Sequence, residues 1–562
     1  MEEKKYVKIS LGTAIAIAII FILVICALII FGFYYYNLNN KDQNENTNSN
    51  VITNTNNSEN YENNTENEPK IDVSDDFEYK FLKLENKKEN VVYSPLSIKY
   101  ALKMLEEASN SETKNQISKL IGKNKLTTYN SNKNFSLANS LFIKNSFETQ
   151  INNSYIDTLK NKYNAEIKFD SFENANNINN WIKEKTYEII PNIIADNDVN
   201  ELDFALINAL AIDMEWEEKF IMQRYLSTEF LHEKRSLDNN LDWKEKSEKG
   251  INVWDIENVS SNTFKNDNNE IKVSGMNIYA TINNYDILKE LGEENIKKIV
   301  GDEYRKFAKG EEYDTEHAYG DFPLSEDVSD EGIEKALEEF FPTYISELDS
   351  NYHKYGSSTD FSIYTDEDVK IFAKDLKEYD NTTLQYIGIM PVSEDLDKFI
   401  TNIDNEKINK YISNLKEIDY KNFKEGVVTR IIGFIPKFNF EYSLDLKEDL
   451  KLCNVTNVFD SEKADLGNMI DGEAYISDAL HKANIEFTQD GIKAAAATFL
   501  GGMGAGAPFN YEFDVPVEEI DITFDKPYMF LIRDKETGEI WFTGTVYEPL
   551  LWEEEPEKNN VY

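Results

Sequence analysis

The chain has 562 residues, of which 41% are hydrophobic and 13% aromatic, enough apolar material for a large core and additional segments. Its formal net charge of −44 argues against nucleic acid as a partner and against adhesion to anionic lipid, because both need clustered lysine and arginine. The two cysteines, Cys26 and Cys453, and four scattered histidines provide neither a disulfide framework nor metal-ligand spacing, so we expect no metal and no cofactor.

Residues 9–36 predict a transmembrane segment. The stretch contains no charged side chain and is longer than the apolar region of a cleaved signal peptide. Lysines within residues 1–8 favour a cytoplasmic N-terminus, which places the rest of a single-pass protein outside the cell. Cleavage or lipidation is the alternative, but Ile25 before Cys26 is not the small residue that a bacterial lipoprotein site requires.

Residues 37–75 predict a disordered linker. The segment is rich in Asn and Glu and has too little apolar surface to offset the entropy of ordering the chain. A flexible chain of this length holds the following domain a few tens of ångströms from the membrane. The abundance of Asn, Lys and Ile indicates an A+T-rich genome, which together with the lysine-flanked anchor favours a bacterial source.

Short motifs follow one another along residues 76–552. In chain order they occupy residues 92–97, 138–142, 180–182, 204–208 with Trp216 and Phe220, 369–374, 383–391, 435–438, 481–483 and 526–534, and Gly538, Gly544 and Pro549 follow. The alternating apolar pattern within 369–391 predicts a strand and its turn.

An acidic stretch at residues 230–361 separates the earlier motifs from the later ones. Helical patterns at 285–300 and 329–341 predict an ordered subdomain, because a structureless loop of this length is uncommon in a folded protein. The sequence leaves two interpretations open. The subdomain is either an insertion without a separate role or a module that binds an unknown partner.

The segment after residue 488 combines small side chains with glycine. Alanines are followed by a glycine-rich run at residues 501–506 that no stable helix tolerates. Small side chains suit a segment that changes conformation, because they enter a packed sheet without a large cavity. We name the following residues the hinge: Gln489, Gly491, Ile492, Ala494, Ala495, Ala496, Ala497 and Thr498.

The hinge and the ordered motifs resemble the serpins, the serine protease inhibitor family. The resemblance covers residues 76–552 and implies an α+β fold with mixed β-sheets, a large central sheet, surrounding helices and an exposed reactive loop. It identifies residues 230–361 as an insertion that serpins usually lack. Residues 553–562 then form a short tail.

The resemblance also implies a mechanism. A serine protease cleaves the reactive loop and forms an acyl-enzyme, after which the loop enters the central sheet as a strand and traps the protease. Counting in family register from the hinge places the scissile bond at Ala505–Gly506, with Met503 as the alternative. Alanine at this position fits elastase-like or subtilisin-like proteases, and the sequence has no Lys or Arg between Ala494 and Asp525.

Four polar residues are expected beneath the insertion site, according to the same resemblance. They are Ser94, Ser97, Asn208 and His481, which we name the polar gate. Serine and histidine together also suggest a hydrolase, but no Gly-x-Ser-x-Gly motif surrounds Ser94, and the resemblance gives these groups a structural role. We therefore expect that the protein is not an enzyme.

Two hinge residues depart from the pattern of inhibitory serpins. Ile492 replaces a small hydroxyl residue, and its bulk could slow the first step of insertion. Gln489 replaces a glutamate, so its expected contact with Lys437 becomes a hydrogen bond. The alternative function is therefore a non-inhibitory, serpin-like binding protein at the cell surface. The alanine-rich hinge favours inhibition.

Overall fold

The computed structural model describes most of the chain between residues 76 and 552. The described residues are 76–122, 126–200, 202–220, 259–266, 269–319, 328–351, 354, 356, 360–479, 481–492, 510–511 and 513–552. The predicted anchor at 9–36, the linker at 37–75 and the tail at 553–562 lie outside this set. No helix within it is long and apolar enough to cross a membrane.

The largest sheet has seven strands, and each neighbouring pair is antiparallel. In spatial order they are β1 (Val91–Tyr93), β20 (Ile540–Val546), β19 (Tyr528–Asp534), β11 (Leu384–Pro391), β10 (Val369–Asp375), β9 (Phe361–Thr365) and β12 (Lys416–Glu417). Every residue of β11 and β20 is buried, which explains their nearly continuous apolar sequences. A Cβ at Gly544 would lie 2.0 Å from the Val91 carbonyl oxygen, so only glycine lets β1 approach β20.

A second sheet contains four strands in the order β18 (Val517–Asp521), β13 (Val428–Pro436), β7 (Asn269–Asn283) and β6 (Val259–Asn266). The pair β13–β18 is parallel, whereas β13–β7 and β6–β7 are antiparallel. Strands β6 and β7 come from the acidic stretch 230–361. Part of that stretch therefore completes a sheet with strands from the C-terminal third of the chain, which its sequence pattern does not indicate.

Two smaller sheets are joined only at one end. One consists of β3 (Ala165–Asp170), β2 (Phe135–Lys144) and β4 (Phe204–Ile212), and the other of β14 (Phe438–Leu444), β15 (His481–Phe487), β16 (Gly491–Ile492) and β5 (Met214–Glu215). Strand β5 continues the direction of β4 after a single residue, Asp213. Among the described residues, β4 pairs with β2 along one edge, and its other edge is unpaired.

Helices surround these sheets. They are α2 (Phe77–Leu84), α3 (Pro95–Ala108), α4 (Ser111–Ile121), α5 (Asn153–Tyr163), α6 (Asn176–Lys185), α7 (Asp196–Val199), α13 (Leu396–Thr401), α14 (Asn405–Ser413) and α15 (Leu446–Leu452), with 3-10 turns at Asn145–Phe147, Tyr420–Asn422 and Asn457–Phe459. Pro95 occupies the first position of α3, where a missing N–H costs nothing, and the Ser94 hydroxyl caps the helix. Helix α6 packs its apolar side against β2 and β4. The mixed helices and sheets confirm the predicted fold class.

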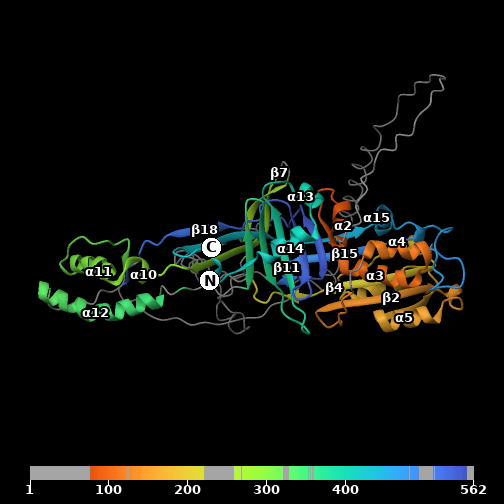
Figure 1. The fold of residues 1–562 in the computed structure, drawn as a ribbon, viewed down its shortest axis with the longest axis horizontal. Coiled ribbons are helices and arrows are strands. Elements are labelled where there is room, and N and C mark those ends of the chain that lie inside the picture. Colours follow the sequence, from red (N-terminus) through yellow and green to blue (C-terminus); the bar gives the residue numbers. More distant parts are fainter. Residues whose placement is uncertain are drawn as a thin grey trace, which may run out of the picture. The chain divides into compact units, whose positions relative to one another are not determined.

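A helical subdomain lies between β7 and β9 in the chain. It consists of α10 (Ile287–Leu291), α11 (Glu293–Ala308), the two-residue strand β8 (Ala318–Tyr319) and α12 (Asp330–Asn351) (Figure 1). These elements enclose a separate apolar core that includes Ile296, Val300, Tyr304 and Leu337. Burial of apolar surface in this core stabilises the subdomain.

Candidate functional site

The hinge enters the described structure as β16, a two-residue strand between β15 and β5. Ile492 pairs with Phe487 of β15 and with Met214 of β5, and Gly491 pairs with Glu215. A Cβ at Gly491 would lie 2.3 Å from the Met214 carbonyl oxygen, so a larger residue could not make this close approach. The first hinge residues are therefore already extended and paired on both sides.

A tight turn connects β15 to β16. The Thr488 backbone N–H donates to the Gly491 carbonyl oxygen over 3.1 Å, and the Thr488 hydroxyl donates to the same oxygen. The Trp216 indole N–H donates to the Thr488 carbonyl oxygen over 2.8 Å, and its backbone N–H donates to Asp490. Because Trp216 is fully buried, the start of the hinge is fixed to the core.

The prediction of a hydrogen bond between Gln489 and Lys437 is wrong. The Gln489 Nε2 group instead donates to Asp490 Oδ2 over 3.3 Å, and its Oε1 atom is buried without a hydrogen-bond partner. The Lys437 backbone N–H donates to Ser274 of β7. Gln489 therefore does not connect the hinge to the strand that follows β13.

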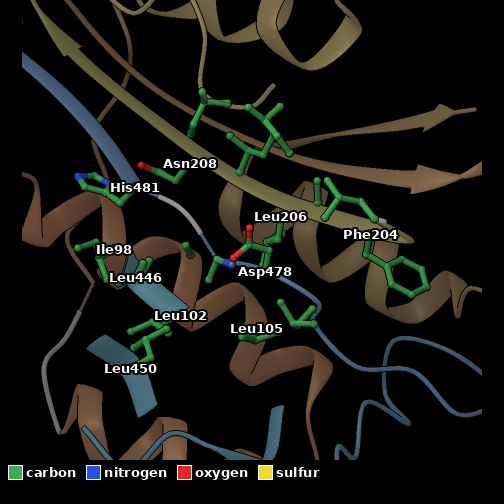
Figure 2. Close-up of a pocket in the computed structure, with 18 of the residues that line it drawn as sticks. Ile98, Leu102, Leu105, Phe204, Leu206, Asn208, Leu446, Leu450, Asp478 and His481 are labelled. Atoms are coloured by element: carbon green, nitrogen blue, oxygen red, sulfur yellow. Dashed lines mark hydrogen bonds between the residues drawn. The ribbon is translucent and has the colours of Figure 1, made fainter. Parts of the chain in front are cut away.

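Beyond β16, the edges of β4 and β15 border a gap that we name the slot. Three cavities occupy it, and each is lined by residues of both strands or of the segments next to them. Ile212, Ile485 and Ile492 line the cavity nearest the hinge. Asn208 and His481 line the other two, and Figure 2 shows them with Leu102, Leu105 and Leu450 around one of these two cavities.

The two strands that border the slot direct alternate side chains toward the main core. In β15 the buried residues are His481, Ala483, Ile485 and Phe487. In β4, Leu210 and Ile212 belong to the main core, whereas Ile207 and Ala209 belong to the cluster beneath α6. The inner face of the slot is thus apolar except at Asn208 and His481.

A segment after α6 also lines the slot. Ile189, Ile190, Ile193 and Ile194 contribute to the cavities, and Ile190 is buried. No sequence motif singles out these residues. Their signal is two isoleucine pairs on either side of Pro191, outside any periodic element. An added strand in the slot would therefore meet these side chains.

The four residues of the polar gate lie together at the slot. The Ser94 backbone N–H donates to His481 Nε2 over 3.0 Å, and the Ser97 backbone N–H donates to Ser94 Oγ over 3.0 Å. The Ser97 hydroxyl donates to Asn208 Oδ1. The Asn208 amide N–H in turn donates to Asn139 Oδ1 of β2 over 2.6 Å, and the sequence does not distinguish Asn139 from the many other asparagines.

This geometry does not resemble a hydrolase. His481 Nε2 accepts from a backbone N–H, so this nitrogen is not available to take a proton from a serine hydroxyl. The Ser94 hydroxyl oxygen caps α3. Burial lowers the pKa of His481 to about 4, which keeps the imidazole neutral at pH 7. The contacts among the four residues are those of a structural hydrogen-bond network.

We expect the gate to make stability depend on pH. His481 has a pKa of about 4 in the fold and an ordinary value of 6.5, so only the unfolded chain binds this proton between the two values. Its contribution to the free energy of unfolding therefore falls as the pH decreases from 6.5 to 4, by on the order of 3 kcal/mol. Urea unfolding of the native chain and of His481→Gln across this range measures the effect. Parallel curves would refute it.

The central part of the reactive loop lies outside the described residues. This part includes Ala494–Ala497, Thr498, Met503, Ala505 and Gly506. The described chain resumes at β17 (Asn510–Tyr511) and continues from Phe513 into β18. We name residues 510–516 the distal stem.

A family model described as "Serpin (serine protease inhibitor)" matches residues 76–239 and 356–549. The chain belongs to the serpin family. Serpins are typically inhibitors of proteases and not catalytic enzymes. The matched ranges of this serpin leave out residues 240–355, which contain β6, β7 and the helical subdomain.

Individual serpins resemble the chain over most of its length. Mouse neuroserpin is 23% identical over 495 residues, which cover 84% of this chain and 89% of neuroserpin. The crystal structure of native tengpin, a thermophilic serpin, matches with a TM-score of 0.52 and 21% identity, covering 85% of this chain and 93% of tengpin. Thyroxine-binding globulin in complex with thyroxine gives a TM-score of 0.51 and 16% identity, with coverage of 85% and 98%. These structures support the fold.

Proposed function

We propose that this serpin is a suicide-type inhibitor of extracellular serine proteases with elastase-like or subtilisin-like specificity. The target cleaves the reactive loop and becomes an acyl-enzyme, and the loop then enters the slot as a new strand while the protease is still attached. One observation carries the proposal. Strand β16 is already paired between β5 and β15 at the end of a slot whose edges are otherwise unpaired among the described residues.

The pairing of β16 defines the register of the added strand. Each two-residue step along the hinge moves two residues back along β4 and along β15, because both pairings are antiparallel. This register sets Ala494 between Ile212 and Ile485, Ala496 between Leu210 and Ala483, and Thr498 between Asn208 and His481.

The side chains of the hinge suit these neighbours. Ile492 points into the core, so Ala494, Ala496 and Thr498 would do the same, since side chains alternate along a strand. Small alanines would meet the large aliphatic residues that line the slot, and the Thr498 hydroxyl would arrive beside the polar gate. Lys493 would face outward, where its ammonium group stays solvated.

Ile492 presents no obstacle in this arrangement. From sequence alone, the bulk of Ile492 is expected to slow the first step of insertion. The side chain is only 2% exposed and packs in the main core before any cleavage. Insertion would therefore begin at the next residue and needs no further space for Ile492.

The loop sequence supports the specificity. A scissile bond at Ala505–Gly506, or one after Met503, offers a small or unbranched side chain to the primary pocket of the protease. Trypsin-like enzymes need a basic side chain, and residues 494–525 contain none. Elastase-like and subtilisin-like enzymes accept such residues.

A panel of serine proteases tests the proposal. Residues 70–562 should form a covalent complex with an elastase-like or subtilisin-like enzyme that survives denaturant, and protease activity should fall in proportion. The variant Ala505→Arg is the matched control, because it should lose these targets and gain trypsin-like ones. Cleavage of the loop without a complex by every enzyme of the panel would refute inhibition.

The alternative is a binding protein with a serpin fold. The Oε1 atom of Gln489 is buried without a hydrogen-bond partner, so the hydrogen bonds of the hinge are incomplete. Thyroxine-binding globulin in complex with thyroxine shows that a protein of this fold binds a small ligand. In that case the same panel would give only cleaved chain and full protease activity. The paired β16 strand and the slot favour inhibition.

We further propose that the inhibitor is a bacterial, single-pass membrane protein. Residues 9–36 would form the anchor, residues 1–8 would be cytoplasmic, and the linker at 37–75 would hold the serpin domain outside the cell. The apolar stretch and the lysines that precede it support this topology.

Protease digestion of intact cells should release the domain from its anchor. The linker is the expected site of cleavage, because it lacks the apolar side chains that a folded segment needs. Sequencing of the released fragment should find an N-terminus between residues 37 and 76. A domain that is fully protected until the cells are lysed would contradict the topology.

A further inference from the structure

The helical subdomain contacts the distal stem of the reactive loop through a two-stranded sheet. Strand β8 of the subdomain pairs with β17 in antiparallel orientation, with Ala318 opposite Tyr511 and Tyr319 opposite Asn510. Strand β17 lies only a few residues after the proposed scissile bond. The helical subdomain, which lies outside the residues matched by the family model, therefore pairs with the segment that follows the reactive loop.

The contact includes a buried anchor. Phe513 is 6% exposed and belongs to the core of the helical subdomain, together with Ile296, Val300 and Tyr304. Its ring packs edge-on against Tyr511, with 4.9 Å between the ring centroids. The distal stem thus completes the subdomain's core, and its departure would expose apolar surface on both sides.

A turn in the subdomain holds the other face of Tyr511. The His317 ring stacks on the Tyr511 ring with 5.9 Å between centroids and an interplanar angle of 24°. His317 is itself fixed by Asp314, since 2.8 Å separates Nδ1 from Oδ2, and the Asp314 backbone N–H donates to Glu303 of α11 over 2.7 Å. The turn therefore forms a preorganised surface for the tyrosine ring.

The stem is also held on its other side. Val428 of β13 donates its backbone N–H to the Pro516 carbonyl oxygen over 2.8 Å, and β18 then runs parallel to β13. Val428 also packs against the subdomain's core. Along the chain, the stem therefore contacts the subdomain at Tyr511 and Phe513, and then the sheet at Pro516.

Because the stem is attached after the scissile bond, the attachment restrains an intact loop but not the cleaved segment that precedes the bond. Cleavage at Ala505–Gly506 leaves residues 493–505 connected to β16 alone, so they can enter the slot while the stem stays in place. An intact loop is tied at both ends. At about 3.3 Å per residue, residues 493–505 would extend roughly 40 Å into the slot, and residues 506–509 are too few to return to β17.

We propose that the helical subdomain is a latch on the distal stem, which prevents the intact reactive loop from entering the slot and leaves entry of the cleaved loop unaffected. This inference rests on the proposed inhibitory function, because it concerns the same slot. It assigns the subdomain an intramolecular ligand, the Tyr511–Phe513 stem, and explains why an active inhibitor keeps its uncleaved form. In the absence of the latch, uncleaved insertion would need only the detachment of β18.

The test measures how fast the intact full-length chain inserts its loop on warming. Tyr511→Ala with Phe513→Ala opens the latch, and Tyr475→Ala, which removes an aromatic ring 43% exposed elsewhere, is the control. Mass spectrometry shows that the chain is unbroken, and resistance of residues 499–508 to added protease reports insertion. The open variant should convert at least about tenfold faster than the native chain, because loss of a buried aromatic ring exceeds the energy of a tenfold change.

A second variant closes the latch permanently and guards against simple loss of folding. Ala318→Cys with Tyr511→Cys joins two residues that lie opposite each other in the β8–β17 pair. Under oxidising conditions the intact chain should convert more slowly than the native chain, whereas loop cleavage should still raise its thermal midpoint. Reduction should restore the native rate.

The outcomes separate this inference from the proposed function. If cleaved chains gain stability but the open, closed and native latches convert at equal rates while intact, the latch is refuted and inhibition stands. If cleavage produces no gain in stability in any variant, the slot does not accept the loop and the proposed function itself fails.

Discussion

Replacing Ala494 and Ala496 together with glutamate should convert the inhibitor into a substrate. In the register set by β16, these positions lie between Ile212 and Ile485 and between Leu210 and Ala483, on the apolar inner face of the slot. Burying an unpaired carboxylate there costs several kcal/mol. Hydrolysis of the acyl-enzyme would then be faster than insertion, and the protease would leave unharmed.

The measurement is the number of inhibitor molecules consumed for each protease molecule inactivated. The native chain should approach one, and the double variant should be cleaved completely with little loss of protease activity. Lys493→Glu is the control, since this position faces outward and a carboxylate there remains solvated. A double variant that still forms the covalent complex at the native ratio would show that these residues do not enter the slot.

Cleavage of the loop between Phe499 and Pro508 should raise the thermal midpoint sharply. A strand of about fifteen residues adds hydrogen bonds worth about 1 kcal/mol each, so the gain is on the order of 10 kcal/mol. For a domain of this size the corresponding shift is on the order of 10 °C or more. Calorimetry of residues 70–562 before and after limited proteolysis measures it.

The glutamate variant separates insertion from the mere removal of a loop. When Ala494 and Ala496 are both glutamate, the same cleavage should leave the midpoint nearly unchanged, because the new strand cannot be buried. An equal rise in both proteins would mean that strand insertion is not the source of stability.

The sequence predicted the features that depend on local pattern or on motif. The pattern in residues 369–391, which predicts a strand and its turn, corresponds to the paired strands β10 and β11, and the motif Ser94-Pro95 corresponds to the capped start of α3. The polar gate was proposed from the resemblance, and the structure brings its four residues into one network. Helix-capping residues and the order of the motifs are visible in the sequence, so these features can be predicted without a structure.

Other features depend on pairings between distant residues and could not be read from the sequence. Strands β8 and β17 contain two residues each, too few for a periodic signal, and almost two hundred positions separate them. The resemblance predicts a contact between Gln489 and Lys437, but the Gln489 side chain instead donates to Asp490. The role of Phe513 likewise becomes visible only when the helical subdomain's core is assembled.

Disulfide trapping tests the central claim, that residues 493–500 fill the slot in the register of β16. Ala495→Cys and Ala211→Cys would lie opposite each other on the outer face, whereas Ala497→Cys would be displaced from Ala211→Cys by two residues, too far for a disulfide. In residues 70–562 the only native cysteine is Cys453, which is buried. After loop cleavage the matched pair should cross-link and the displaced pair should not. Failure of the matched pair, or equal cross-linking of both, would contradict the account.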